Sequence, residues 1–307
     1  MQTFYTLSTE QQHTAVALGF FDGLHRGHRR VLAGAARQQK NGLLPVCFTF
    51  SESPKSVIRG KALPALMTQE DKLHALAQIG MAHVYLTDFR AVMHLDARDF
   101  FTEILVGTLK VRALFCGFNY RFGKNAEGDV RLLQTLCVEH GVLLTVVPPE
   151  TDGGEVVCST LIRQLLEKGD IRRANALLGS RFGMCATVRH GRRLGRQLGT
   201  PTLNQTPAKG LAVPPYGVYA SVVTLENGMP YCGVTNIGVK PTVGGTELLW
   251  ETWMPHYTGG EIYGETADVR LLDFIRPERK FGSLEALKAE ILRNGEQAER
   301  IYLSRHT

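Results

Sequence analysis

Short apolar runs alternate with helical patterns through the first half of the chain. Five of these runs predict buried strands, because they are short and almost continuous in apolar character. They are Thr14–Phe20, Leu44–Phe50, His83–Leu86, Ala113–Phe118 and Val142–Val147. Repeated alternation of strands and helices is typical of a parallel sheet with helices on both faces. We therefore expect an α/β domain at the N-terminal end.

Polar residues mark where the helices between these strands begin. Thr68-Gln-Glu-Asp71 resembles a capping box, with Asp where Glu or Gln is usual, ahead of an apolar helical face. Asp129 is placed to cap a second helix that ends at Gly141. Two shorter helices are expected at Ser159–Lys168 and Asp170–Leu178, each ended by a glycine.

After Gly179 the pattern changes to strands bordered by Gly and Pro, with no helical patterns between them. The expected strands are Gly183–His190, Gly217–Leu225, Tyr231–Ile237, Leu248–His256 and Thr266–Asp273. Strands without helical crossovers favour an antiparallel barrel. Ser283 is placed to cap a final amphipathic helix. The sequence thus predicts two domains, 1–180 and 181–307, which suits a chain of 307 residues.

Composition adds two restrictions. The six cysteines form no C-x-x-C pair and lie mostly in apolar runs, so buried reduced thiols are expected instead of disulfides or zinc. No apolar run approaches the roughly 20 residues of a membrane span, and the start of the chain lacks a signal-peptide pattern. The expected location is the cytoplasm, without membrane partners.

The formal charge of +6 raises the question of nucleic acid. The basic residues cluster only at His25–Arg30 and Arg189–Arg196, without the aromatic residues of a single-strand platform. Either cluster could be a solvated charged face. Because both are embedded in Gly-rich turns, compact anions such as nucleotide phosphates fit better than nucleic acid.

The first cluster belongs to a ten-residue segment, G-F-F-D-G-L-H-R-G-H, that runs from Gly19 to His28. It joins a predicted strand to a predicted helix, whose free N–H groups and positive dipole end attract phosphate. His25 and His28 would share one face of the first helical turn and could donate hydrogen bonds to phosphate oxygens. The plain alternative for an isolated H-x-x-H is a pair of surface histidines.

This segment resembles the nucleotidyltransferase superfamily, and in its longer form the N-terminal module of the prokaryotic bifunctional riboflavin kinase/FAD synthetase family. The stretches from Gly117 to Gly128 and from Cys158 to Arg163 are also similar to that module, although Cys158 replaces a usual Ser. The resemblance implies a Rossmann-like nucleotidyltransferase domain with His25 and His28 as catalytic residues. It implies that Asn119 contacts nucleotide or flavin. It further implies ATP and phosphate contacts from Gly19, Phe21, Asp22, Gly23, Ser159, Thr160 and Arg163.

The second cluster overlaps the stretch Gly191–Asn204, in which glycines and arginines precede P-T-x-N. It is not a Walker A loop. Its glycines would let N–H groups converge on phosphate, and a Thr hydroxyl with an Asn carbonyl suits Mg²⁺. A basic solvated hairpin is the alternative on composition alone.

This stretch resembles the riboflavin kinase signature. The resemblance implies phosphate contacts from Gly191, Gly195 and Gly199, and Mg²⁺ bound by Thr202 and Asn204. It places Asn236 and Arg276 at flavin or nucleotide and makes Glu251 the catalytic base. Trp253 departs from the family's E-x-H, and the last helix reads L-K-A-E-I-L-R-N-G instead of L-x-x-Q-I-x-x-D. These departures bear on flavin affinity and kinase rate more than on nucleotide binding.

The resemblance implies a bifunctional enzyme that phosphorylates riboflavin to FMN with ATP and then adenylylates FMN to FAD, with release of pyrophosphate. Its substrates and cofactors would be riboflavin, FMN, ATP and Mg²⁺. Two rivals stay open: an FMN adenylyltransferase with a weakened or inactive kinase barrel, and a flavin- or nucleotide-binding regulator. We expect small-molecule partners, no specific nucleic acid, and a monomer or weak homo-oligomer.

Overall fold

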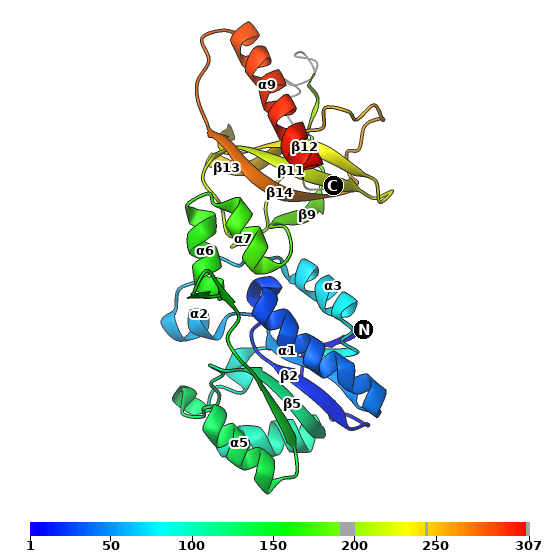
Figure 1. The fold of residues 1–307 in the computed structure, drawn as a ribbon, viewed down its shortest axis with the longest axis vertical. Helices are drawn as coiled ribbons and strands as arrows, with labels where there is room; N and C mark the ends of the chain where they lie inside the picture. The colour runs from blue at the N-terminus through cyan, green and yellow to red at the C-terminus, as the bar shows by residue number, and fades with distance from the viewer. Residues whose placement is uncertain (191–199, 243–244, 305–307) are drawn as a thin grey trace. The chain divides into compact units, whose positions relative to one another are not determined.

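A computed structural model describes residues 1–190, 200–242 and 245–304 of the chain (Figure 1). The chain divides into two compact units, each treated separately below. The first unit comprises Met1–Ala65 and Gln69–Ser159, and the second comprises Leu66–Thr68 and Thr160–Thr307. The predicted domain boundary at residues 180 and 181 stays a prediction.

The first unit is built on a parallel sheet in the order β1-β4-β3-β2-β5-β6. This confirms the predicted α/β class, and the five expected strands are present with small shifts of their ends. The strand β1 was not predicted, because three residues are too short for a pattern. The strands are β1 (Gln2–Phe4), β2 (Thr14–Leu18), β3 (Leu44–Phe50), β4 (His83–Thr87), β5 (Val111–Gly117) and β6 (Leu143–Val147), with a small hairpin of β7 (Thr151–Asp152) and β8 (Glu155–Val156).

Helices lie on both faces of this sheet. The α-helices are α1 (Arg26–Ala36), α2 (Pro54–Arg59), α3 (Gln69–Ile79), α4 (Ala97–Asp99) and α5 (Val130–Glu139), and η4 (Phe100–Thr108) is a π-helix. Shorter 3₁₀ turns are η1 (Asp22–Leu24), η2 (Arg37–Asn41), η3 (Phe89–Ala91) and η5 (Lys124–Ala126). Asp129 caps α5 as predicted, since its carboxylate accepts the amide N–H groups of Arg131 and Leu132 at 2.9 Å.

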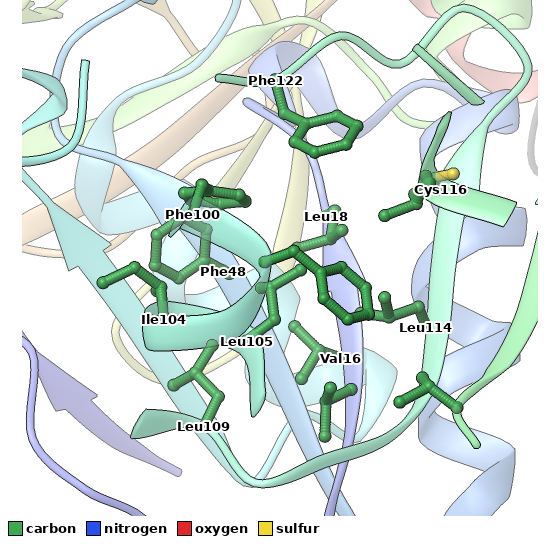
Figure 2. Close-up of a cluster of buried hydrophobic side chains, with 14 of the residues drawn as sticks. Val16, Leu18, Phe48, Phe100, Ile104, Leu105, Leu109, Leu114, Cys116 and Phe122 are labelled. Atoms are coloured by element: carbon green, nitrogen blue, oxygen red, sulfur yellow. The ribbon is translucent and has the colours of Figure 1, made fainter. Parts of the chain in front are cut away.

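The two faces differ in how they are packed. On one face α1 comes so close to β5 that a Cβ on Gly34 would lie 2.5 Å from the Phe115 ring. On the other face, Val16, Leu18, Leu114 and Cys116 pack with Phe100, Ile104 and Leu105 of η4 (Figure 2). Successive strand residues point to opposite faces, so each of the central strands β2 and β5 contributes to both layers. The sheet is therefore buried on both sides.

The strand order reverses between β2 and β5. From β2 the chain continues to β3 on one side, and later returns to β5 on the other side of β2. The carboxyl ends of β2 and β5 are neighbours, with Leu18 opposite Cys116. Ligands of open parallel sheets bind at such a reversal of strand order. The Gly19–His28 segment starts at this point.

The second unit contains an antiparallel sheet in the order β10-β13-β12-β11-β14-β9. Arg189, two residues beyond β9, donates its N–H to the carbonyl of Asn204 in β10 at 2.8 Å, so the two edges of the sheet meet. This supports the barrel that the Gly- and Pro-bordered strands predicted. The strands are β9 (Gly183–Thr187), β10 (Thr202–Gln205), β11 (Gly217–Leu225), β12 (Pro230–Thr242), β13 (Gly245–Trp253) and β14 (Thr266–Pro277).

The helices of the described part of this unit are α6 (Ser159–Glu167), which begins one residue before it, α7 (Ile171–Leu178) and α9 (Leu284–Leu303). Asn175 of α7 is buried, donates to the Leu271 carbonyl at 2.8 Å and accepts the Phe182 N–H at 2.7 Å. Ser283 caps α9 as predicted, and α9 lies across β11, β12 and β14 (Figure 1).

All six cysteines are free, and four of them are buried as expected. The prediction is less apt for Cys158, which is half-buried, and for Cys185, which is exposed. Within the described ranges, no helix has both the length and the apolarity needed to cross a bilayer.

Candidate active sites

The Gly19–His28 segment turns sharply at the end of β2. Phe21 has a left-handed backbone with φ of 56°, and Leu24 has φ of 44°. A non-glycine residue in this region costs about 1 kcal/mol or more and persists only where its surroundings enforce it. Gly19 is required for the turn, since a Cβ there would lie 2.9 Å from the Phe21 ring. Backbone geometry is thus strained where the phosphate contacts were predicted.

The two histidines meet at the start of α1. His25 is the N-cap residue, and its Nδ1 accepts the backbone N–H of His28 at 3.3 Å. The two imidazoles stack with ring centroids 3.5 Å apart, and Phe21 meets the His28 ring edge-on at 5.3 Å. Because Nδ1 of His25 acts as an acceptor, the neutral ring carries its proton on Nε2. His25 is therefore preset as an Nε2–H donor.

Burial keeps both imidazoles uncharged near neutral pH. Desolvation lowers the pKa of His25 from 6.5 to about 4. The pKa of His28 is also lowered well below 6.5, chiefly by desolvation, and further by unfavourable charge interactions with a protonated His25 and with Lys72. Within the described residues, Nδ1 of His28 is shut off from solvent and has no hydrogen-bond partner. Neutral rings can donate to phosphate without the cost of burying a charge.

Lys72 is a residue of this site that the sequence interpretation missed. Its side chain is buried, with Nζ donating to the carbonyl of Phe20 at 2.6 Å and to the Thr49 hydroxyl at 2.9 Å. Desolvation lowers its pKa to about 8. A signal was present, because Lys72 stands one helical turn before the buried Leu76 of α3 and so on the same face.

The other predicted residues of this site are placed as follows. Asp22 is buried, and its carbonyl accepts the Ser159 hydroxyl at 3.1 Å. Asn119 is exposed, two residues after β5 and hence at the carboxyl edge of the sheet. Thr160 and Arg163 belong to the second unit, so their role at this site stays a prediction.

The arginines of the first basic cluster are partly engaged by acidic residues after β6. Arg30 pairs with Glu150 at 2.7 Å, and Arg26 reaches Glu150 and Asp152 at 3.5 Å. These contacts tie the first turns of α1 to the β6–β7 connection. The two histidines instead contact each other, and His28 also contacts Phe21.

In the second unit, strand register brings four predicted residues into one row. Asn204 of β10 lies opposite Glu251 of β13, and Glu251 lies opposite Asn236 of β12. The row continues through Val218 of β11 to Arg276 of β14. Directly opposed residues of antiparallel strands place their side chains on the same face. Four residues far apart in sequence therefore line one side of the barrel.

The same face carries the contact with α9. Two residues along from the row, Trp253 lies opposite Thr202 and Val234. Trp253 is buried in the apolar cluster beneath α9, and a Cβ on Gly295 would lie 2.8 Å from its indole ring. Trp253, which departs from the family pattern, thus packs against the last helix at Gly295.

Acidic and basic partners hold the row in place. Glu251 forms an ion pair with Lys240, which lies four residues after Asn236 on β12. Asn236 donates to the carboxylate of Glu278 at 3.2 Å. Arg276 pairs with Glu290 of α9 at 3.1 Å and donates to Asn294 at 3.3 Å. Lys240, Glu278 and Glu290 were not predicted, because only the folded sheet brings them to the row.

The predicted metal ligands lie on a strand instead of in a turn. Asn204 is buried, and its Nδ2 donates to the Thr202 carbonyl at 3.4 Å, which leaves Oδ1 available. The described residues contain no group of three His, Cys, Asp or Glu side chains fit to hold a metal. Gly191, Gly195 and Gly199 lie outside the described residues.

Comparison with known proteins agrees with this division. Residues 7–161 match the family model of FAD synthetase, and residues 178–302 match that of riboflavin kinase. The Escherichia coli (strain K12) protein named bifunctional riboflavin kinase/FMN adenylyltransferase is 36% identical over 287 residues, covering 92% of this chain and 91% of its own length. The Bacillus subtilis protein of the same name is 32% identical over 306 residues, covering 97% and 95%.

A solved structure shares the fold along the whole chain. The crystal structure of a macrolide-efflux protein from Streptococcus pneumoniae superimposes with a TM-score of 0.87 at 28% identity, covering 97% of this chain and 99% of that one. Two family models that together span almost the whole chain, and relatives above 30% identity over nearly its full length, lead to one assignment. The chain belongs to the family of bifunctional riboflavin kinases/FMN adenylyltransferases.

Proposed function

We propose that the second unit phosphorylates riboflavin at the Asn204–Glu251–Asn236 row, and that the first unit adenylylates FMN at the Gly19–His28 loop. The main support for this proposal is the strand register, which places Asn204 opposite Glu251 and Glu251 opposite Asn236. The kinase activity is the one that the altered sequence around Trp253 puts in question. In spite of that change, the Glu251 carboxylate lies in register with the amide side chains of Asn204 and Asn236, as a phosphoryl-transfer site would need.

Kinase chemistry follows from the position of Glu251. Its carboxylate accepts the proton of the terminal ribityl hydroxyl as that oxygen attacks the γ-phosphorus of ATP. The bond from the γ-phosphorus to the bridging oxygen breaks, and ADP leaves. The ion pair with Lys240 fixes the carboxylate before substrate arrives. Asn236 and Arg276, in the same row, hold flavin or nucleotide.

Mg²⁺ fits the donor set around β10. Thr202 and Asn204 offer a hydroxyl and an amide oxygen, which are hard ligands of the kind Mg²⁺ prefers. Mg²⁺ usually takes one or two protein ligands and completes its shell with phosphate and water, so a site without a carboxylate cluster is suitable. When bound, the ion would neutralise charge on the ATP phosphates. Gly191, Gly195 and Gly199 are proposed to contact those phosphates.

Adenylyl transfer follows from the helix start and the two imidazoles. A phosphate oxygen of FMN attacks the α-phosphorus of ATP, the bond to the bridging α–β oxygen breaks, and pyrophosphate leaves with the electron pair. The Nε2–H of His25, a ring N–H of His28 and the N-terminal end of α1 stabilise charge on the phosphates. Gly19, Phe21, Asp22 and Gly23 shape the phosphate loop. Asn119, Ser159, Thr160 and Arg163 are proposed to contact the substrates.

A product assay tests both reactions at once. Purified protein is incubated with MgATP and either riboflavin or FMN, and the flavins are separated by chromatography. We expect riboflavin to give FMN and then FAD, and FMN to give FAD with one pyrophosphate released per FAD. FAD from FMN without any FMN from riboflavin would establish the decayed-kinase alternative. No product from either substrate would establish the binding-regulator alternative.

Further expectations concern the setting of these reactions. We propose that the chain works in the cytoplasm as a monomer or weak homo-oligomer, with small molecules and no nucleic acid as partners. Light scattering coupled to size-exclusion chromatography tests the oligomeric state. Competition of FAD synthesis by single-stranded RNA tests the last point, and we expect no inhibition beyond that of a simple salt control.

A further inference from the structure

Lys72 is the one buried lysine among the described residues. Its ammonium lies beneath the phosphate loop of the first unit, in contact with the Phe20 carbonyl and the Thr49 hydroxyl. It also lies 4.7 Å from the centroid of the Phe20 ring. Burying an ammonium costs several kcal/mol unless hydrogen bonds and charges compensate. Such a group, placed at a strained loop, calls for an explanation beyond packing.

The hydrogen bonds of Lys72 act at the start of the strained segment. Phe20 precedes Phe21, the first residue with a left-handed backbone. The Phe20 carbonyl accepts two hydrogen bonds, from Nζ at 2.6 Å and from the Thr49 hydroxyl at 2.9 Å. Thr49 in turn accepts from Nζ, so the three groups form a closed triangle between α3, β3 and the loop. This triangle fixes the peptide plane from which the loop departs.

The charge of Lys72 acts on the groups that face it. These are Asp22 of the loop, His28 of α1 and Cys47 of β3. The Asp22 carboxylate favours the ammonium form, whereas the ammonium disfavours a proton on His28. His25, stacked on His28, works in the same direction. The Lys72 ammonium thus adds to desolvation in keeping the His28 imidazole neutral.

We propose that Lys72 is a positioning residue for adenylyl transfer, which holds the loop at Phe20 and keeps His28 as a neutral hydrogen-bond donor. This inference rests on the proposed adenylyltransferase function of the first unit. Lys72 reaches the reaction through the loop and through His28, and its effect is therefore on the rate of the chemical step more than on substrate affinity. Misplacement of catalytic groups by about 1 Å can lower a rate about 100-fold.

The principal test is Lys72→Met in the full chain, which retains the length and apolar stem of the side chain. We expect kcat for FAD formation to fall about 30-fold, with the KM for ATP changed less than about 3-fold. Removing the positive charge raises the pKa of His28, so the acid limb of kcat/KM moves toward neutral pH. Lys40→Met, at an exposed lysine of η2, is the matched control and should leave both quantities unchanged.

A second variant guards against misfolding. FMN formation from riboflavin reports whether the purified chain retains its other activity. If Lys72→Met is misfolded, Thr49→Val decides, because it removes one side of the triangle and leaves the charge. We expect a fall in kcat of about 5-fold with the acid limb in place. The inference would be overturned if a folded Lys72→Met protein kept wild-type kcat and an unmoved acid limb. If Lys72→Met is misfolded, wild-type kcat in Thr49→Val would overturn it instead. Failure of the unaltered protein to make FAD from FMN would instead overturn the proposed function.

Discussion

The two sites of this chain are built in opposite ways. The proposed adenylyl-transfer site is concentrated in ten consecutive residues at one strand–helix junction, Gly19 to His28. The proposed kinase site is a row across five strands, from Asn204 on β10 to Arg276 on β14. A local site depends on backbone conformation and burial, whereas a distributed site depends on the register of the whole sheet. We therefore expect the loop site to tolerate few substitutions within Gly19–His28, and the row site to tolerate substitutions at positions around the row.

The electrostatics of the two sites differ accordingly. The loop site holds two neutral imidazoles and one ammonium, all buried or nearly so. The row site holds charges that are already paired, Glu251 with Lys240 and Arg276 with Glu290. The first is prepared to receive charge from a ligand. In the second, the charges are held in place by partners from neighbouring elements.

Replacement of His28 should produce the largest effect and separate the sites most sharply. His28→Ala removes a preorganised donor, and loss of one such donor lowers kcat by about 10³-fold. We expect FAD formation from FMN to fall by this factor, while riboflavin is still converted to FMN and FMN accumulates. Chromatography of flavins after single-turnover and steady-state reactions measures both rates.

The matched control for this experiment is His74→Ala, at an exposed histidine that contacts only Gln78 in the described structure. It should leave both activities unchanged. If a folded His28→Ala protein lost both activities equally, the assignment of the two reactions to separate sites would be wrong.

Glu251→Gln should give the reciprocal result with a somewhat smaller factor. Glutamine preserves the shape of the side chain but accepts no proton, and general-base catalysis contributes about 10²-fold or more. FMN formation from riboflavin should fall by that amount, while supplied FMN is still converted to FAD. Glu247→Gln, four residues earlier on the same face of β13, is the control and should retain kinase activity. Equal loss in both variants would argue against a base at Glu251.

The same contrast explains what the sequence could predict. The buried strands and the caps at Asp129 and Ser283 depend on neighbouring residues, and they were predicted correctly. His25 and His28 were expected to share one face of the first helical turn, and their rings are in contact. The strand β10 was missed, because its residues read as part of a Gly-rich turn. The alignment of Asn204 with Glu251 could not be predicted from residues alone, since pairing register is set by contacts between distant segments.

Buried charges escaped prediction for a related reason. Lys72 reads as a surface lysine unless the face of α3 that meets the sheet is known. Lys240 and Glu290 matter because they pair with Glu251 and Arg276, which lie on other elements of the fold. The family resemblance supplied the residues proposed for both sites. Their supporting residues came only from the fold.

Acid should weaken the loop site selectively. The pKa of His25 is lowered from 6.5 to about 4 in the folded protein. Between these values the unfolded chain binds a proton that the folded chain does not, so stability falls as the pH falls from about 6.5 to 4. The full shift corresponds to about 3 kcal/mol, and the lowered pKa of His28 acts in the same direction.

Hydrogen exchange of the β2 and β5 amides at pH 7.5 and 4.5 measures this loss in the first unit. His25→Gln should reduce the pH dependence by about 3 kcal/mol. Both tryptophans, Trp250 and Trp253, belong to the second unit, so their fluorescence during urea unfolding monitors that unit separately. A pH dependence of β2 exchange that is identical in the two proteins would contradict the burial argument.

The smallest predicted effect concerns the contact that permits Trp253 in the kinase barrel. Helix propensity alone predicts that Gly295→Ala stabilises α9 by about 0.5–1 kcal/mol. The added Cβ, however, would lie 2.8 Å from the Trp253 ring, and overpacking a buried contact costs about 1–3 kcal/mol. We expect net destabilisation of about 1 kcal/mol in urea unfolding followed by tryptophan fluorescence.

The sign of that change decides whether Trp253 and Gly295 form one unit. In a Trp253→His background the ring is smaller, the steric conflict disappears, and Gly295→Ala should become stabilising by the helix-propensity amount of about 0.5–1 kcal/mol. The coupling free energy between the two positions is then about 2 kcal/mol. This is well above the deviation of about 0.3–0.5 kcal/mol within which independent sites are additive. Additive effects would instead mean that Trp253 and Gly295 do not form one packing unit. Coupling of this size would show that the barrel absorbed Trp253 beneath α9 while the register of Asn204, Glu251 and Asn236 stayed in place.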